Sequence, residues 1–501
     1  MMRTRPRRVH TYRGGGARWR CVRFRWTASL GCSAPSTMTH PQVVRVYSTY
    51  QDPDYECPWQ SVAPRGSTGS GVVIGAHRIL TGAHVVANAT FVQVQKQSDP
   101  KKFTARVLAI SHDSDLALLE VEDKAFTRGI KPAVVGDLPK LRDEVQVVGY
   151  PIGGEEVSIT EGVVSRVEVQ RYEHSQRHLL AVTVDAAINE GNSGGPVFAR
   201  GKVVGIAFQA LPDAENVGEM VPAPILKVFL DGVKKGKPAD VPGIGVSTQP
   251  LENPALRKHF GMRKADSGVL VTAVQYASSA WSAFEPGDVL MQLHGHKIAD
   301  NGTIKYRGRY RCQFDALIGD FHCGDRVKAR VLRRGKAKDV ELLMQPMQWL
   351  VPRTEYDRRP MWFVFGGLVF QRVTAEYLRN WGDSWWDKAP KGLLHDFYYG
   401  LRRPERQEVV VLAQVLADDV NVGYESFSND AVTGVDGKLP VDMADFVKRM
   451  DRASGEVVIQ LASGATVLLD VEGARAAEGR IQDLYHLPGD RSADLPRRRR
   501  R

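Results

Sequence analysis

The sequence predicts a mainly β protein with about three folding units. Its 501 residues exceed what one compact core supports, and roughly 150 residues per domain gives about three units. Short runs of Val, Ile, Thr and Phe alternate with Gly, Pro and Asp turns along residues 43–233, for example at 70–74, 91–95 and 203–208. Many short strands at this spacing favour a β-barrel or a β-sandwich.

The remaining chain divides into two more β-rich units. Residues 234–242 mix charge with two prolines and are typical of a linker. The polar, proline-containing residues 347–359 separate a unit at 243–346 from one at 360–471. Both units repeat a strand, a loop, a second strand and a Gly-containing turn, and a helix is expected at 441–450. This weak repeat predicts two related modules.

The positive charge of the chain lies in its two ends. The net charge is +11, but residues 1–51 hold ten Arg and no acid, and five Arg end the chain. The body between them is slightly acidic, which argues against nucleic acid as a partner. Residues 472–501 are expected to form a basic C-terminal tail.

The Arg-rich, acid-free start with scattered Ser and Thr is typical of an organelle transit peptide. We therefore expect residues 1–41 to be a transit peptide or disordered leader and the protein to reach a mitochondrion or chloroplast. Two alternatives stay open. A true start at Met38 would remove this argument, and the final run of Arg could be a nuclear address.

Several functional classes are disfavoured by what the sequence lacks. Five Cys without a CxxC pair describe neither a disulfide framework nor a structural zinc site. No run approaches the roughly 18 apolar residues of a spanning helix, so no integral membrane segment is expected. No Walker-type phosphate loop is present, which favours a reaction independent of ATP. We expect no metal and no cofactor.

The strongest chemical signal is a serine within a cluster of glycines, Gly191-Asn192-Ser193-Gly194-Gly195. Acyl transfer needs a serine hydroxyl on a tight turn with backbone N–H groups facing the developing oxyanion, and glycines permit both. Ordinary turn chemistry would explain the same residues. The cluster therefore indicates a nucleophile only if a suitable base is also present.

A candidate base and a candidate carboxylate occur upstream. His84 ends an apolar run among small residues, and Asp115 stands in a polar turn that enters an apolar strand. Each has an ordinary structural alternative, since a lone His often packs in a core and Asp is common before strands. The conjunction of His, Asp and Ser predicts nucleophilic catalysis.

The segments LTGAHVV, HDSDLALL and GNSGGPVF, in this order, resemble the Deg/HtrA (Do-like) serine proteases. The segment VGYPIGG and residues 185–189 resemble the plant and algal subgroup. The resemblance covers residues 42–485 and implies a chymotrypsin-like double β-barrel protease domain followed by two PDZ-like domains. The implied bounds are 42–233 for the protease, 243–346 for the PDZ domain and 360–471 for the second PDZ-like domain.

The resemblance also implies the role of each site residue. His84 is the general base, Asp115 orients it and Ser193 is the nucleophile, with the backbone N–H groups of Gly191 and Ser193 as the oxyanion hole. Asp113 is a competing carboxylate, but the DLA pattern of the family selects Asp115. The implied function is degradation of misfolded or damaged proteins through an acyl-enzyme. The alternative is an inert PDZ scaffold or holdase chaperone.

Substrate and partner preferences follow from fewer residues. Trypsin-like proteases place an acid six residues before the nucleophile, whereas here Ala187 is followed by Ile188. A cationic side chain would lack a partner there, so we expect cleavage after small or medium aliphatic residues.

C-terminal peptides are expected at a loop of the PDZ domain formed by Ile244, Gly245 and Val246. Gly366, Gly367 and Leu368 are the candidate loop of the second module, with a simple strand start as the alternative. The family implies a homotrimer or a multiple of trimers.

Overall fold

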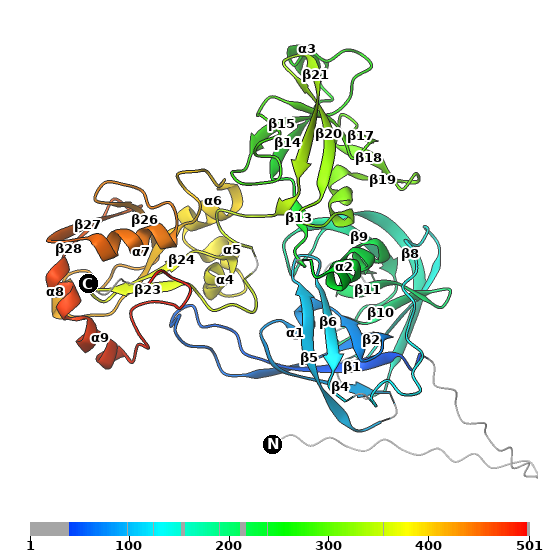
Figure 1. Ribbon diagram of the computed structural model, residues 1–501, viewed down its shortest axis with the longest axis horizontal. Helices are drawn as coiled ribbons and strands as arrows, with labels where there is room; N and C mark the ends of the chain where they lie inside the picture. The colour runs from blue at the N-terminus through cyan, green and yellow to red at the C-terminus, as the bar shows by residue number, and fades with distance from the viewer. Residues whose placement is uncertain are drawn as a thin grey trace, which may run out of the picture. The chain divides into compact units, whose positions relative to one another are not determined.

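The computed structural model describes residues 40–97, 99–123, 125–151, 156–189, 191–210, 217–237, 239–353 and 355–497 (Figure 1). The transit peptide or leader expected for residues 1–41 lies outside these ranges except for its last two residues, and so do the last four arginines of the chain. Residues 40–501 form one compact unit.

Two closed six-stranded barrels form the first part of this unit. The strands of the first run in the order β1-β2-β3-β6-β5-β4 and those of the second in the order β10-β11-β12-β9-β8-β7. The first barrel contains β1 Val43–Tyr50, β2 Arg65–Gly75, β3 Arg78–Thr81, β4 Ala89–Lys96, β5 Lys102–Ser111 and β6 Leu116–Val121, with the short helix α1 Ala83–Val86. The second contains β7 Glu144–Gly149, β8 Ser158–Arg171, β9 His178–Asp185, β10 Pro196–Ala199, β11 Lys202–Ala210 and β12 Val217–Pro222, followed by helix α2 Ala223–Lys235. The predicted double barrel is confirmed.

Alternation of apolar and polar residues explains why these segments form barrel strands. In β4, Val92 and Val94 are buried, while Gln93 and Gln95, which alternate with them, are only partly buried. Val46 of β1, directly opposite Val94, is completely buried. Successive side chains of a strand point to opposite faces, so this pattern fills the barrel interior with branched apolar side chains.

The first PDZ-like unit packs on the second barrel and shares its hydrophobic core. Its sheet has the order β14-β15-β16-β20-β21, which leaves β14 at an edge. The phenolic hydroxyl of Tyr310 donates at 2.6 Å to the carbonyl of Pro139, in the segment that leads into β7 of the second barrel. The elements are β13 Pro242–Gly243, β14 Val246–Pro250, α3 Pro254–His259, β15 Val269–Val274, β16 Val289–Leu293, β17 His296–Lys297, β18 Thr303–Tyr306, β19 Tyr310–Gln313, η1 Phe314–Asp320, β20 Arg326–Arg333, β21 Lys336–Leu343 and β22 Gln345–Pro346.

The second PDZ-like unit is one six-stranded sheet in the order β23 to β28. The aromatic residues Trp362, Phe363 and Phe370 are buried in it. The helix expected at 441–450 is α7. The elements are β23 Trp362–Phe365, β24 Leu368–Arg372, α4 Ala375–Leu378, η2 Arg379–Trp381, α5 Trp385–Lys388, α6 Lys391–Tyr399, β25 Val410–Val415, η3 Asp419–Asn421, β26 Asp430–Val435, α7 Met443–Arg452, β27 Glu456–Leu461, β28 Thr466–Asp470, α8 Val471–Ala476 and α9 Glu478–Tyr485.

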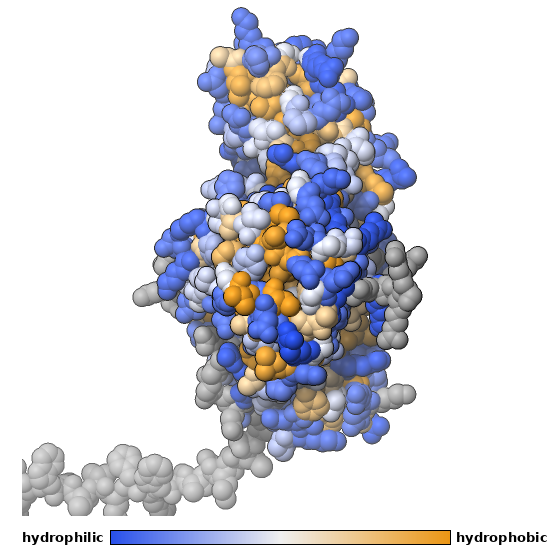
Figure 2. Space-filling model, turned by 90° about the vertical axis from the view of Figure 1, so that its left-hand side faces the viewer, coloured by the Kyte–Doolittle hydropathy of each residue, from blue (hydrophilic) through white to orange (hydrophobic). Residues whose placement is uncertain are grey.

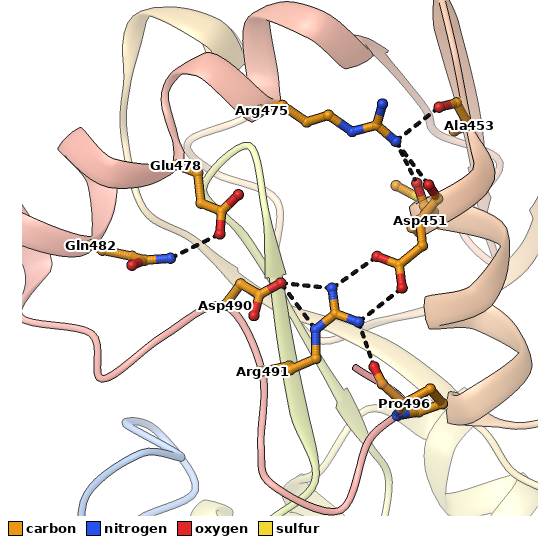
Figure 3. A network of polar contacts seen from close by, with 9 residues as sticks. Asp451, Ala453, Arg475, Glu478, Gln482, Asp490, Arg491 and Pro496 are labelled. Atoms are coloured by element: carbon orange, nitrogen blue, oxygen red, sulfur yellow. Dashed lines mark hydrogen bonds and ion pairs between the residues drawn. The ribbon is translucent and has the colours of Figure 1, made fainter. Parts of the chain in front are cut away.

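Residues 472–497 differ from the basic tail expected from the sequence, because most of their arginines are paired inside the fold. They form most of α8, all of α9 and a segment that returns to β23 (Figure 3). Val364 donates its N–H to the Asp490 carbonyl at 2.7 Å, and Ser492 donates to the Trp362 carbonyl at 2.9 Å. The Arg491 guanidinium contacts both carboxylate oxygens of Asp451, at 2.8 and 2.9 Å.

We expect Arg491→Ala to lower the free energy of unfolding by about 3 kcal/mol. The Arg491 side chain is only 8% exposed, and its removal leaves Asp451 without its cationic partner. Arg330→Ala is the matched control, because Arg330 also pairs with an aspartate, Asp339, but both side chains are exposed, by 48% and 78%. That change should cost less than about 1 kcal/mol. Urea denaturation checks both values, and equal losses would contradict the assignment.

Hydrophobic and hydrophilic residues are interspersed on the molecular surface that Figure 2 shows. On the face drawn in Figure 2, hydrophobic residues lie in small areas separated by hydrophilic ones. Among the described residues, no helix has the length and apolar character needed to cross a membrane. Cys57, Cys312 and Cys323 are free thiols, and the Cys312 Sγ lies 3.4 Å from the Val167 carbonyl oxygen of the second barrel.

Candidate active site

The structure brings His84 and Asp115 into direct contact. His84 lies in the one-turn helix α1 after β3, and Asp115 lies in the turn before β6, which pairs with β3. The Asp115 carboxylate accepts the His84 backbone N–H at 2.8 Å and lies 2.7 Å from Nδ1 of the ring. Because an ionised carboxylate only accepts hydrogen bonds, Nδ1 carries the proton. In the neutral ring, Nε2 then presents the lone pair that a general base needs.

The competing carboxylate, Asp113, faces away from this pair. It lies 2.8 Å from the guanidinium of Arg177, a buried side chain. Asp113 also accepts the backbone N–H of Val241 at 3.1 Å. The two carboxylates, separated by one residue, therefore serve different partners, one of them in the site and the other in the packing of the second barrel.

The turn that carries Ser193 packs against the first barrel. Ser70 of β2 donates its N–H to the Ser193 carbonyl at 2.9 Å, and the Ser70 hydroxyl donates to the Gly191 carbonyl at 2.7 Å. A methyl group added to Gly194 would lie 2.4 Å from Thr81 Oγ1. Only glycine permits so close an approach of the two barrels.

Gly82 lies between the imidazole and the serine turn. A methyl group at Gly82 would lie 2.7 Å from His84 Cε1 and 3.6 Å from Gly194 Cα. The ring and the turn are thus neighbours. His84 Nε2 is buried and makes no hydrogen bond with any described residue, so the contact with the half-buried Ser193 hydroxyl is not formed here. Catalytic hydrogen bonds often tighten only when substrate binds.

Two backbone donors in the serine turn are available. Gly191 has a φ of +93°, and the N–H groups of Gly191 and Ser193 donate no hydrogen bond to another residue that the structure describes. The N–H of Gly194, by contrast, donates to the Ala207 carbonyl at 2.8 Å. Glu190, next to the turn, lies outside the described residues. The turn can therefore direct two N–H groups towards an oxyanion.

The charges of the pair favour an ionised Asp115 and a basic His84. Burial disfavours the imidazolium of His84, but the charge and hydrogen bond of Asp115 and the charge of Glu173 outweigh it and raise the pKa of His84. Burial opposes ionisation of Asp115, yet its charge and hydrogen-bond interactions with His84 hold the pKa of Asp115 below its usual value. The acid is thus suited to orientation and the ring to proton transfer.

The residues expected to limit specificity lie between β9 and the serine turn. Ile188 is 7% exposed, and a methyl group at Gly218 of β12 would touch its side chain. Thr160 donates its hydroxyl to the Ala187 carbonyl at 2.9 Å. Ala187 and Ile188 therefore contribute no charge to the part of the site expected to limit specificity.

The peptide-binding loop expected in the first PDZ-like unit lies directly before the edge strand β14. Ile244 is buried and Gly245 has a φ of +76°. The carbonyls of both residues are fixed, since Ala280 donates its N–H to Ile244 at 3.0 Å and Gln275 donates to Gly245 at 2.9 Å. Val246 begins β14, whose outer edge is the one where an added strand would pair.

The corresponding glycines of the second unit have another role. Gly366 and Gly367, with φ of +55° and +80°, form the two-residue turn between β23 and β24. Asn421 donates to the Gly366 carbonyl at 2.8 Å and fixes this turn. β24 pairs on both sides, and the outer side of β23 meets residues 490–492. Simple strand geometry, the alternative expected from the sequence, explains these glycines.

Sequence reasoning missed four residues beside the candidate catalytic pair, His84 and Asp115. His112 and His174 hydrogen-bond to each other at 3.0 Å, and the ring of His174 lies 6.2 Å from that of His84. Tyr356 and Asp357 come from the segment between the PDZ-like units. The Tyr356 ring lies against both histidines, and the Asp357 carboxylate contacts His112. No spacing signal could identify the four together, because they come from three separate segments of the chain. Among the described residues, no group of His, Cys, Asp or Glu could hold a metal ion.

Comparisons with known proteins identify the family of both parts of the chain. Residues 69–206 match the trypsin-like peptidase domain family and residues 351–494 match a PDZ domain family. The chain is 37% identical to "Protease Do-like 2, chloroplastic" of Arabidopsis thaliana, over 90% of this chain and 75% of that protein. It is 34% identical to "Protease Do-like 4, mitochondrial" of the same plant, over 90% of this chain and 85% of that protein. The holdase alternative gains no support. The chain belongs to the Do-like, or Deg/HtrA, family of serine proteases.

Proposed function

We propose that this protein is an ATP-independent serine endopeptidase in which Ser193 is the nucleophile, His84 the general base and Asp115 the residue that orients it. The observation that carries the proposal is the double contact of one Asp115 carboxylate with the backbone N–H and the ring Nδ1 of His84. This contact fixes both the position and the tautomer of the imidazole, which is what proton transfer from a serine requires.

The reaction proceeds in two acyl-transfer steps. His84 Nε2 takes the proton of the Ser193 hydroxyl while the oxygen attacks the peptide carbonyl, and it then returns the proton to the leaving amine. Water repeats the sequence on the acyl-enzyme and frees Ser193. The N–H groups of Gly191 and Ser193 stabilise the oxyanion, and loss of one such donor typically costs about 10² to 10³ in rate.

The substrates are misfolded or damaged proteins cleaved after small or medium aliphatic residues. The uncharged Ala187 and the buried Ile188 support this preference, because a substrate Lys or Arg would be desolvated without a partner. The edge strand β14 and the loop at Gly245 support capture of a C-terminal peptide as an added strand.

The protein acts in a mitochondrion or chloroplast and assembles as a homotrimer or a multiple of trimers. The organellar location is supported by the Arg-rich, acid-free residues 1–37. It is also supported by relatives whose names describe them as chloroplastic or mitochondrial. The trimeric assembly is proposed from the family resemblance. Imaging with and without residues 1–37 tests the location, and light scattering of the purified chain tests the assembly.

Digestion of denatured casein tests the activity. The wild-type protein is expected to degrade casein without ATP, with cuts mainly after Val, Ala, Leu or Ile, whereas Ser193→Ala should lose at least about 10⁴ of the rate. Mass spectrometry of the fragments gives the cleavage positions. Equal degradation by Ser193→Ala would refute the nucleophile, and cuts mainly after Lys and Arg would refute the specificity.

A further inference from the structure

A chain of contacts joins the segment between the two PDZ-like units to the catalytic pair. Asp357 accepts the Asn88 N–H at 2.6 Å, and Asn88 accepts the Asp357 N–H at 2.6 Å. The other Asp357 oxygen lies 2.8 Å from His112 Nε2, and His112 Nδ1 lies 3.0 Å from His174 Nε2. The Tyr356 ring stacks on His174, with centroids 4.2 Å apart and planes at 9°.

The direction of these hydrogen bonds follows from their carboxylate end. Asp357 accepts, so Nε2 of His112 is the donor. When His112 is neutral its Nδ1 accepts, and the proton between the two rings then belongs to Nε2 of His174. Hydrogen bonds that continue in one direction reinforce one another. Asp357 thereby selects the tautomers of two histidines, the second of which lies beside His84.

His174 is held neutral in this position. Burial lowers the pKa of His174 to about 3, and the positive charges of His84, His112 and Arg379 act in the same direction against that of Asp115. The imidazole rings of His84 and His174 are surrounded by six other charged or titratable groups. These are Asp115, Glu173, His112, Tyr356, Asp357 and Arg379. A neutral His174 leaves Asp115 with a single imidazolium partner, His84.

The loop that carries His174 is fixed from the second barrel as well. It connects β8 and β9, and Glu173 donates its N–H to Gln209 at 2.9 Å. Arg177, at the other end, pairs with Asp113 and donates to the Pro242 carbonyl at 2.6 Å. The loop is thus anchored on both sides of His174, and Tyr356 covers the face of its ring.

We propose that Tyr356 and Asp357 are positioning residues of the active site, which hold His174 beside His84 and Asp115 and so make proteolysis depend on docking of the segment between the PDZ-like units. The inference rests on the proposed function, because it assigns these residues through the His84–Asp115 pair. Neither residue needs to touch the substrate. When the segment undocks, Tyr356 no longer covers His174, and His174 is no longer held beside His84.

The pH profile of kcat/KM of the full-length protein on a fluorogenic casein tests the proposal. His84 must be unprotonated to act as base, so activity falls as the pH drops through its pKa. In Tyr356→Ala, the uncovered His174 can take up a proton and place a second positive charge about 6 Å from His84. The acid limb should therefore move to lower pH by roughly one unit, and the plateau should fall about 10- to 100-fold.

Tyr356→Phe keeps the stacked ring and should keep both the wild-type limb and plateau. Tyr399→Ala, which removes a tyrosine that is 75% exposed, is the surface control and should also match the wild type. Asp357→Ala should move the limb in the same direction, because it removes a negative charge near the histidines. It carries the test if Tyr356→Ala does not fold, as judged by circular dichroism.

Each remaining outcome decides between the two proposals. A lower plateau with an unmoved acid limb in Tyr356→Ala and Asp357→Ala would assign a merely structural role and overturn the inference, as would wild-type profiles in both variants. Failure of the proposed function gives a different result. In that case casein cleavage by the wild type would be absent, or would persist in Ser193→Ala, whatever stands at positions 356 and 357.

Discussion

Asp115→Asn is expected to lower kcat on casein by about 10⁴, the loss typical of a Ser–His–Asp site whose carboxylate becomes an amide. The amide can donate a hydrogen bond to Nδ1 of His84, which stabilises the tautomer whose Nε2 carries the proton and cannot act as base. The change also removes the charge that raises the pKa of His84. Steady-state kinetics at saturating casein measure the loss.

Asp113→Asn is the matched control for this change. Asp113 lies two residues earlier but pairs with Arg177 and the Val241 N–H rather than with His84. It should keep kcat within about tenfold and lower the free energy of unfolding by about 1 to 3 kcal/mol, because a buried guanidinium loses its charged partner. Equal losses of kcat in the two variants would show that the contacts of Asp115 are not specific to the chemistry.

The second large effect is expected at Gly194, next to the proposed nucleophile. Its φ is +78°, and an added methyl group would lie 2.4 Å from Thr81 Oγ1 and 2.5 Å from the Ser70 carbonyl. Gly194→Ala must therefore move the serine turn away from the first barrel. Casein cleavage should fall by at least about 10²-fold, since a displacement of about 1 Å costs that much.

Gly201→Ala is the control that separates two effects of Gly194→Ala. One is the steric clash of the added methyl group, and the other is the cost of placing alanine at a positive φ. Gly201 has a similar φ of +71°, but an added methyl group meets nothing within 4 Å. Both variants pay about 1 to 2 kcal/mol for an alanine in the left-handed region. Thermal unfolding should show the smaller loss for Gly201→Ala, and its activity should remain near that of the wild type. Loss of activity in both would indicate that global stability, not the fit of the turn, limits catalysis.

The parts of the account that the sequence predicts are local patterns and motifs. Alternating Val and Gln identify a barrel strand such as β4, and the His84, Asp115 and Ser193 motifs each stand in a short, distinctive segment. The pairing of Asp113 with Arg177 could not be predicted, because the two residues lie in different barrels and meet only after folding.

Charge counting along the chain also misplaced one segment. The five arginines that end the chain suggested a basic tail over residues 472–501, but within it Arg480 and Arg491 pair with Asp418 and Asp451 of earlier parts of the same unit. Arg475 donates to the Asp451 and Ala453 carbonyls. The docking of Asp357 on His112 joins residues 245 positions apart, a separation over which local patterns carry no information. Contacts of this kind depend on how the units pack, which hydrophobic periodicity does not encode.

The site of covalent labelling by a fluorophosphonate tests the central claim most directly. Such a probe reacts with a serine only when an adjacent base activates its hydroxyl. Peptide mapping by mass spectrometry should find the wild-type adduct on Ser193, with labelling abolished in Ser193→Ala and strongly slowed in Asp115→Asn. A folded wild-type protein that takes no label, or that carries it on another serine, would contradict the account.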